Sequence, residues 1–156
     1  MASILDGLRE YFRDQSWPFE LEPDETVLVL RYVAGAHQWT CYAQAREAER
    51  QLVFYSVAPL TVEPARRAAV MEFVTRANYD LVLGNFELDL DDGEVRFKTS
   101  IDIEGVELSR ELIRPVVHAN LLLVEQYLPG LIAVADGTLP PGEAMARCES
   151  DPRTDS

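Results

Sequence analysis

The stretch from Leu81 to Ile103 limits the fold of this chain more than any other. Two runs of alternating apolar and polar residues flank Asp92-Gly93, a pair that favours a two-residue type I′ turn between antiparallel strands. The cross-strand pairs in that register are Leu90–Val95, Leu88–Phe97, Phe86–Thr99, Asp89–Arg96 and Glu87–Lys98, with Gly84 opposite Ile101. A shift by one residue would turn the apolar set toward solvent. The segment therefore predicts a β-hairpin.

Hydrophobic periodicity places the other elements. Helices are predicted over 3–14, from Glu63-Pro64 to Asn78, and from Ser109 to about Leu128, with a break at Pro129-Gly130. Strands are predicted over 26–33, 37–47 and 51–58, and residues 19–21 are compatible with a short edge strand. The resulting order, α-β-β-β-α-β-β-α with short connections, predicts an α+β domain. It would contain a single antiparallel sheet with helices packed mainly on one face.

The chain of 156 residues fits one domain, assigned to residues 1–146, with a flexible polar tail over 147–156. Cys41 alternates with apolar neighbours and is expected in the core, whereas Cys148 falls in the tail, so a disulfide is not expected. The N-terminus lacks the basic segment and apolar core of a signal peptide. No apolar run approaches the roughly 20 residues of a membrane span. We therefore expect a cytoplasmic protein.

The charge balance disfavours two classes of partner. The chain carries 14 basic and 27 acidic residues, and 14 − 27 gives a net charge of −13. Nucleic-acid affinity depends mainly on basic contacts to phosphate, and anionic membranes attract basic segments. We therefore expect neither nucleic acid nor a membrane among the partners.

No motif for metal binding or catalysis is found. The acidic turn at Asp89, Asp91, Asp92 and Glu94 lacks the calcium-loop spacing, and His37 and His118 fit no zinc motif. No serine-hydrolase elbow or phosphate-binding loop is present. A Cys41–His118 nucleophilic pair stays open, although Cys41 is better explained as a core residue. We expect no catalytic residues, no metal and no cofactor.

Several segments together resemble one protein family. They are Trp39-Thr-Cys-Tyr-Ala-Gln-Ala-Arg-Glu, Leu52-Val-Phe-Tyr-Ser, Glu72-Phe-Val-Thr-Arg-Ala-Asn-Tyr, Gly84-Asn-Phe-Glu-Leu-Asp, Asp92-Gly-Glu-Val-Arg-Phe-Lys-Thr-Ser-Ile-Asp and Tyr127-Leu-Pro-Gly. In this combination, over about residues 5–146, the chain resembles the bacterial YbjN family, most closely its cyanobacterial forms. The signature residues are Trp39, Tyr42, Asn78, Tyr79, Gly84, Asn85, Phe86 and Glu87.

The resemblance implies a fold like that of the type III secretion chaperones, which are small, acidic, dimeric proteins that hold segments of a partner polypeptide. It also implies a regulatory role in sensory transduction or stress, without established catalytic residues. We therefore expect a non-enzymatic protein-binding module that is chaperone-like or regulatory. The alternative is a small-ligand sensor or small enzyme that uses a cavity near Trp39 and Tyr42.

The last long helix also predicts assembly. It is apolar over most of its circumference, more than a one-sided sheet layer can cover. Leu121, Leu122 and Val124 are the residues in excess, and we expect them to form the interface of a homodimer.

Overall fold

The computed structural model describes residues 2–150. The elements are α1 (Ile4–Asp14), β1 (Phe19–Leu21), β2 (Val27–Ala34), β3 (His37–Arg46), β4 (Gln51–Thr61), the short 3₁₀ helix η1 (Pro64–Arg66), α2 (Arg67–Tyr79), β5 (Asn85–Leu88), β6 (Glu94–Asp102), α3 (Arg110–Ala135) and α4 (Pro141–Glu149). The six strands form one antiparallel sheet in the order β1-β2-β3-β4-β6-β5. The prediction of an α+β domain with a single antiparallel sheet is confirmed.

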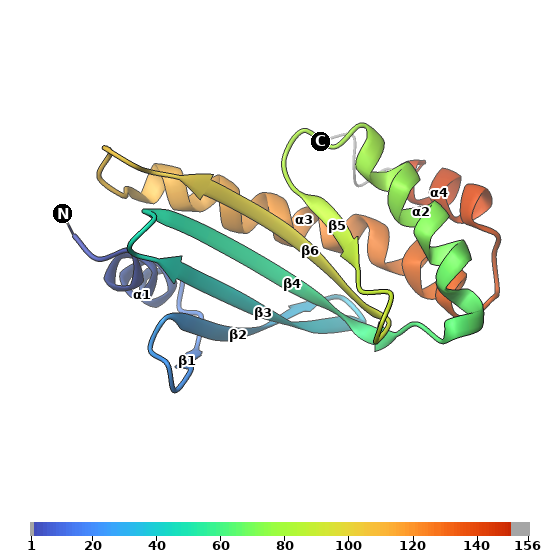
Figure 1. Ribbon diagram of the computed structural model, residues 1–156, viewed down its shortest axis with the longest axis horizontal. Coiled ribbons are helices and arrows are strands. Elements are labelled where there is room, and N and C mark those ends of the chain that lie inside the picture. Colours follow the sequence, from blue (N-terminus) through green and yellow to red (C-terminus); the bar gives the residue numbers. More distant parts are fainter. Residues whose placement is uncertain (1, 151–156) are drawn as a thin grey trace.

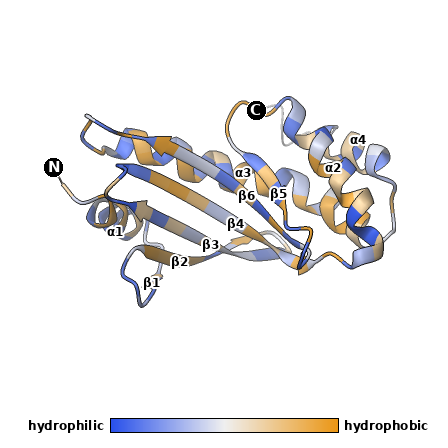
Figure 2. Cartoon of the chain, viewed as in Figure 1, coloured by the Kyte–Doolittle hydropathy of each residue, from blue (hydrophilic) through white to orange (hydrophobic). Residues whose placement is uncertain are grey.

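The helices cover one face of the sheet and one end of it. Helices α1 and α3 lie against the same face, while α2 and α4 pack beside β5 and the second half of α3 (Figure 1). Hydropathy alternates along β3 and β6, as a sheet with one covered face requires, whereas β4 is apolar over most of its length (Figure 2). The main core lies between the sheet and α1 and α3. Its largest fully buried side chains on the strands are Leu28, Leu52, Phe54 and Phe97.

Helix α1 is held at its N-terminus by the turn between β3 and β4. The Ser3 side chain accepts a hydrogen bond from the Asp6 N–H, as an N-cap should. The Glu47 carboxylate accepts hydrogen bonds from the N–H groups of Ile4 and Leu5, at 3.1 and 2.9 Å. Partial burial works against ionisation of Glu47, but these hydrogen bonds outweigh it and lower the pKa of the carboxyl. The turn thus supplies the negative charge that the helix dipole favours.

The hairpin between β5 and β6 forms, but its predicted turn is wrong. Phe86 pairs with Phe97 and Leu88 with Val95, a register shifted by two residues from the prediction. The loop is longer than two residues because the Asp89 N–H bonds to Glu94 O. Gly93 does have a positive φ, +82°. A shift of two preserves which side chains face the core, because side chains alternate with a period of two.

Contacts from elsewhere in the chain select the longer loop. The Val62 N–H donates to Gly93 O at 2.9 Å, and Arg67 bridges Val62 O and Leu90 O at 3.1 and 2.8 Å. A two-residue loop would not extend far enough to make these contacts. A Cβ on Gly93 would lie 2.3 Å from Val62 O, so the loop packs closely onto the end of β4.

The predicted end of the last long helix is also wrong. Helix α3 continues through Pro129 and Gly130 to Ala135, and a further helix, α4, follows it. A Cβ on Gly130 would lie 2.5 Å from Cys148 Sγ and 2.9 Å from Phe73 Cε2. Gly130 therefore allows α2 and α4 to approach α3 closely.

The same contact corrects the predicted tail. Cys148 is buried in α4 and does not lie in a polar tail. Of the predicted tail 147–156, residues 147–149 belong to α4, and residues 151–156 lie outside the described residues.

Helix α3 is long and apolar enough to cross a membrane by length and composition alone. Half of its most apolar window is buried inside the protein, between the sheet and the other helices. Its middle carries Asn120, which is fully buried and hydrogen-bonded to the sheet. These features are those of the central helix of a folded core, which passes the same test of length and composition.

Candidate protein-binding site

The two edges of the sheet differ in how they are protected. At the β5 edge, the side chain of Asn78 acts as a substitute for a neighbouring strand. Its Oδ1 accepts from the Phe86 N–H at 2.7 Å, and its Nδ2 donates to Phe86 O at 3.0 Å. Both outward backbone groups of Phe86 are therefore satisfied by one residue of α2.

The opposite edge is only half covered. Strand β1 pairs with β2 at Leu28–Leu30, and within the described chain no strand continues beside residues 31–34. Pro18 precedes β1 and lacks the N–H needed to extend the ladder. Glu22 N–H donates to Val27 O, so the odd-numbered residues of β2 direct their backbone groups toward this edge. The N–H and C=O of Val33 consequently face outward.

A cavity opens beside this free edge. It has a volume of about 200 Å³ and is mainly apolar. It is lined by Trp17, Pro18, Leu30, Arg31, Tyr32, Val33, Cys41, Phe54 and Leu121. We call the free edge of residues 31–34 together with this cavity the β2-edge site. A free edge beside an apolar cavity is the arrangement that recognises an extended polypeptide, in which main-chain hydrogen bonds bind and a pocket selects the side chain.

A buried polar network supports the sheet next to the cavity. The Trp39 indole N–H donates to Ser56 Oγ at 3.0 Å, and Ser56 Oγ donates to Asn120 Oδ1 at 2.6 Å. Asn120 Nδ2 donates to Phe54 O and Phe97 O, at 2.9 and 3.1 Å. Because each of these groups is paired, the network fixes α3 in one position over β4 and β6.

The Cys41–His118 pair considered from the sequence is not assembled as a catalytic unit. Cys41 Sγ lies 3.5 Å from Ser56 Oγ, whereas His118 Nε2 bonds to the Tyr11 hydroxyl at 2.7 Å. Burial raises the pKa of the Cys41 thiol to about 11, so the thiol is protonated at neutral pH. Burial also lowers the pKa of His118, with Arg114 contributing. Cys41 and His118 each bond to a different residue, so they do not form a nucleophile–base pair.

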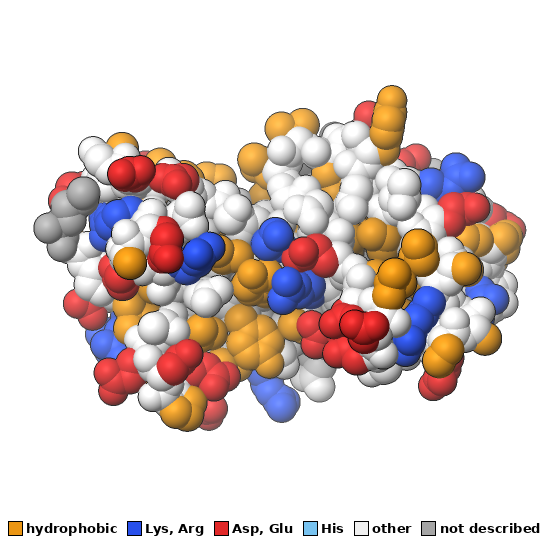
Figure 3. Space-filling model, viewed as in Figure 1, with side chains coloured by type: hydrophobic (Ala, Val, Ile, Leu, Met, Phe, Trp, Pro, Cys, Tyr) orange, Lys and Arg blue, Asp and Glu red, His pale blue; other side chains and the backbone are white. Residues whose placement is uncertain are grey.

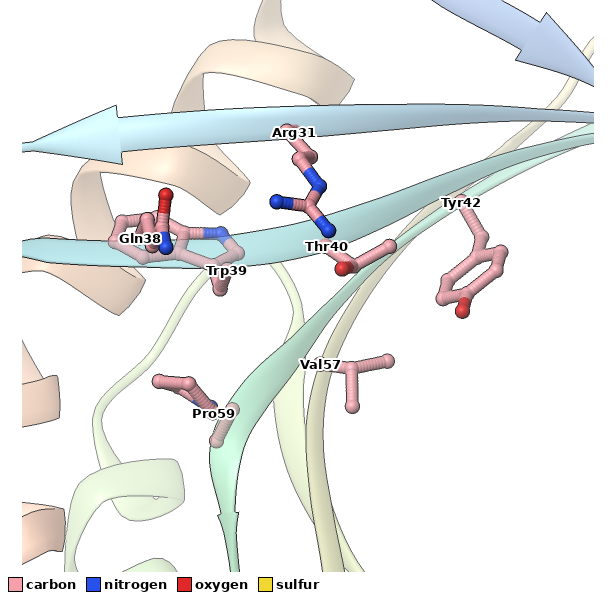
Figure 4. A pocket seen from close by; sticks show the side chains of 8 residues that line it. Arg31, Gln38, Trp39, Thr40, Tyr42, Val57 and Pro59 are labelled. Carbon is pink, nitrogen blue, oxygen red and sulfur yellow. The ribbon is translucent and has the colours of Figure 1, made fainter.

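The cavity predicted near Trp39 and Tyr42 exists on the uncovered face of the sheet. It measures about 300 Å³ and is lined by Arg31, Gln38, Trp39, Thr40, Tyr42, Val57, Ala58 and Pro59 (Figure 4). It forms where β4 leaves β3, since Thr40–Val57 is the last pair between them. The Trp39 N–H points away from it, to Ser56. The cavity is open to solvent and not enclosed.

The signature residues serve mainly to build the fold. Gly84 has φ +78°, and a Cβ there would lie 2.7 Å from Lys98 O, so this position requires glycine. Glu87 pairs with Arg96 and Lys98, at 3.0 and 3.3 Å. Asn85 Nδ2 donates to Phe86 O at 3.3 Å, beside the Asn78 contacts already described. The side chain of Tyr79 is 86% exposed, so packing does not explain why it belongs to the signature residues.

The predicted dimer surface on α3 is wrong for two of its three residues. Leu121 and Val124 are buried within the single chain, and Leu121 lines the cavity of the β2-edge site. Leu122 alone is exposed, at 63%. Helix α3 is apolar on most sides, but the sheet, α1, α2 and α4 together cover it. Few of its apolar residues therefore stay exposed for a partner. One exposed leucine does not define an interface.

The acidic turn at Asp89–Glu94 is a folded loop that faces solvent (Figure 3). The side chains of Asp89 and Asp92 accept hydrogen bonds from the N–H groups of Asp91 and Glu94, both at 2.8 Å. Over residues 2–150, no group of three or more His, Cys, Asp or Glu side chains is placed to hold a metal ion.

The sequence of the chain matches one protein family. The sequence model of YbjN, described as "Putative bacterial sensory transduction regulator", matches residues 5–133. The chain belongs to the YbjN family. No curated protein matches this YbjN-family chain by sequence.

The fold is similar to that of a solved structure. The crystal structure of YbjN from E. coli, described as "a putative transcription regulator", aligns with a TM-score of 0.64 at 15% identity. The alignment covers 87% of this chain and 97% of that one. The HopA1–SchA chaperone–effector complex aligns with a TM-score of 0.46 at 15% identity, over 78% of this chain and 88% of that one. The second similarity is too low to carry an argument, and the first establishes the fold alone.

Proposed function

We propose that this YbjN-family chain is a non-enzymatic protein-binding module with a regulatory or chaperone-like role. It acts in the bacterial cytoplasm as a homodimer, without nucleic acid or membrane as a partner. The β2-edge site is the observation that carries this proposal. It would bind an extended segment of another polypeptide as an additional strand beside residues 31–34.

The chemistry of the β2-edge site supports a polypeptide ligand. Val33 directs an N–H and a C=O outward, and its side chain is 65% exposed on the uncovered face. Tyr32 lies on the opposite face, beside the cavity. An added strand would therefore turn alternate side chains toward Val33 and toward the cavity. A cavity of about 200 Å³ suits one large apolar side chain.

The alternative, a small-ligand sensor or small enzyme at Trp39 and Tyr42, is less well supported. That cavity is open to solvent on the sheet face, to about the same degree as the cavity of the β2-edge site, so enclosure does not favour a small ligand at either place. Neither Cys41 nor His118 lines it. Arg31 contributes a cation there, and in the described part of the chain it has no ion-pair partner, which is the one feature that favours an anionic ligand.

A matched pair of edge variants tests the proposal. Peptides selected from a random peptide library displayed on phage would be synthesised, and their affinities measured by fluorescence anisotropy. Val33→Pro removes the outward N–H while leaving the β2–β3 ladder intact, because proline is tolerated at an edge. We expect Val33→Pro to weaken binding at least roughly tenfold, and Val33→Ala to change it less than about threefold.

Two results would contradict the proposal. One is equal binding by Val33→Pro and Val33→Ala, which would show that the peptide does not use the β2 edge. The other is a selection that enriches no peptide for the wild-type chain while a known peptide-binding domain succeeds in parallel. Circular dichroism confirms that both variants are folded.

A further inference from the structure

The connection from α2 to β5, residues 80–84, carries two apolar side chains that are exposed in the described chain, while Leu81 between them and α2 packs partly on the core. Val82 is 94% exposed and Leu83 is 52% exposed, and Tyr79 at the end of α2 is adjacent. Hydrophobic side chains project from the upper rim of the molecule in Figure 3, where Figure 1 places this connection. Consecutive exposed apolar residues are uncommon on a monomer and mark an interaction surface.

A second free strand edge lies next to this loop. Strand β5 pairs with β6 from Leu88–Val95 to Asn85–Lys98, and no described strand continues beside residues 100–102. Asp89 N–H donates to Glu94 O, so the even-numbered residues of β6 direct their backbone groups toward β5. Ser100 and Asp102 therefore have outward N–H and C=O groups with no strand to pair with.

The loop and the free edge match each other in register. If β5 continued backwards from Asn85–Lys98, Leu83 would pair with Ser100, and Leu81 with Asp102. The β-prone sequence Leu81-Val82-Leu83 predicts such a strand. Gly84, with φ +78°, instead turns the chain away from β6. The Leu81 N–H donates to Asn78 O at 3.3 Å within the chain, so an exchanged strand would have to release this bond. Residues 82–83 and the matching edge have no strand partner in the described chain.

We propose that two copies of this chain exchange these segments across a two-fold axis. Residues 81–83 of one copy add as a strand to residues 100–102 of the other, and the reverse contact forms at the same time. A closed two-fold arrangement is the one that satisfies both edges at once. The proposal rests on the homodimer proposed above and is independent of the β2-edge site.

An apolar cavity accepts the exchanged side chains. It lies beside residues 99–101 and measures about 230 Å³. It is lined by Leu83, Gly84, Thr99, Ser100, Ile101, Leu112, Pro115 and Val116. The protruding Val82 and this cavity are neighbours on one patch. A two-fold interface uses the same patch on both copies, so each copy must present both the protruding Val82 and the cavity that receives the partner's side chain.

The test is the mass in solution, measured by light scattering on a size-exclusion column from about 1 to about 100 µM. The wild type should show twice the single-chain mass of 17.6 kDa. Val82→Glu should raise the dissociation constant at least roughly tenfold, because it buries a charge in the interface. Leu122→Glu is the matched control, an exposed apolar residue on α3, and should leave the dimer intact. Since both side chains are exposed in the single chain, both variants should stay folded by circular dichroism.

A second pair of variants tests strand pairing itself. Ser100→Pro removes an outward N–H that the single chain does not use, and it should weaken the dimer more than Ser100→Ala does. Equal effects of the two would overturn the strand exchange. A dimer dissociated by Leu122→Glu but not by Val82→Glu would also overturn it and leave the homodimer standing. A wild-type mass of 17.6 kDa at every concentration would overturn both.

Discussion

Asn120 offers the sharpest test of how the core is built. The side chain is fully buried, with Oδ1 accepting from Ser56 and Nδ2 donating to Phe54 O and Phe97 O. Asn120→Asp keeps the shape of the side chain and the contact of Oδ1 with Ser56. It replaces the Nδ2 donor by an acceptor oxygen, which would face the carbonyl oxygens of Phe54 and Phe97. The new carboxyl should therefore be protonated in the folded chain, because the protonated form can donate to one of them and the ionised form cannot.

The size of the effect follows from linkage. An aspartate in the unfolded chain ionises near pH 3.9, whereas the carboxyl introduced by Asn120→Asp would stay protonated in the folded chain to a much higher pH. When folding raises the pKa of an acid, the folded state loses stability at every pH above the pKa that the acid has in the unfolded chain. The cost then grows by about 1.4 kcal/mol per pH unit. If the introduced carboxyl is still protonated in the folded chain at pH 7, this contribution reaches about 1.36 × 3.1, or roughly 4 kcal/mol.

The assay is urea unfolding followed by circular dichroism between about pH 5.5 and 7.5, above the pI of about 4.5. Over that range the penalty of Asn120→Asp relative to wild type should grow by roughly 3 kcal/mol. Asn120→Leu is the matched control. It strands the Ser56 hydroxyl without an acceptor and should cost about 2–3 kcal/mol independently of pH.

A penalty of Asn120→Asp that stays flat with pH would refute this reasoning. It would mean that the carboxyl ionises freely and that water reaches the position. Equal pH slopes for Asn120→Asp and Asn120→Leu would point to the same error.

Two further predictions concern the acidic turn. Gly93→Val should lower the melting temperature more than Gly35→Val, by roughly 4 °C or more, since both introduce left-handed strain but only Gly93 meets Val62 O within 4 Å. Equal shifts by differential scanning fluorimetry would show that the loop does not pack on β4. EDTA, calcium and zinc should leave the melting temperature unchanged, and a rise of several degrees at micromolar calcium would establish a site at Asp89–Glu94.

The alternation of apolar and polar residues predicts which side chains of the β5–β6 hairpin face the core, but it does not predict the exact register of the two strands. Alternation predicts that Phe86, Leu88, Val95 and Phe97 point to the core, and the structure agrees. Alternation cannot distinguish two registers that differ by two residues, because they present the same faces. Arg67 and Val62, distant in sequence, decide between them through their contacts with the turn.

Tertiary contact also explains the errors on α3. Pro129-Gly130 is a strong signal for a helix end, yet at this position glycine provides space for Cys148 and Phe73. The burial of Leu121 and Val124 depends on how many elements surround the helix, which its own periodicity cannot reveal. The sequence carries one signal for the β2-edge site: Pro18 lacks an N–H and so predicts where β1 must stop pairing with β2.

The Asn78 amide has a consequence for the behaviour of the chain at high concentration. Its two atoms pair both outward backbone groups of Phe86, as a neighbouring strand would do at this point of β5. Aspartate could not donate, and glutamine would place the amide about one methylene too far. Loss of this amide would leave both backbone groups of Phe86 unpaired and add a further open stretch of strand to those at residues 31–34 and 100–102, which would favour pairing with unrelated chains.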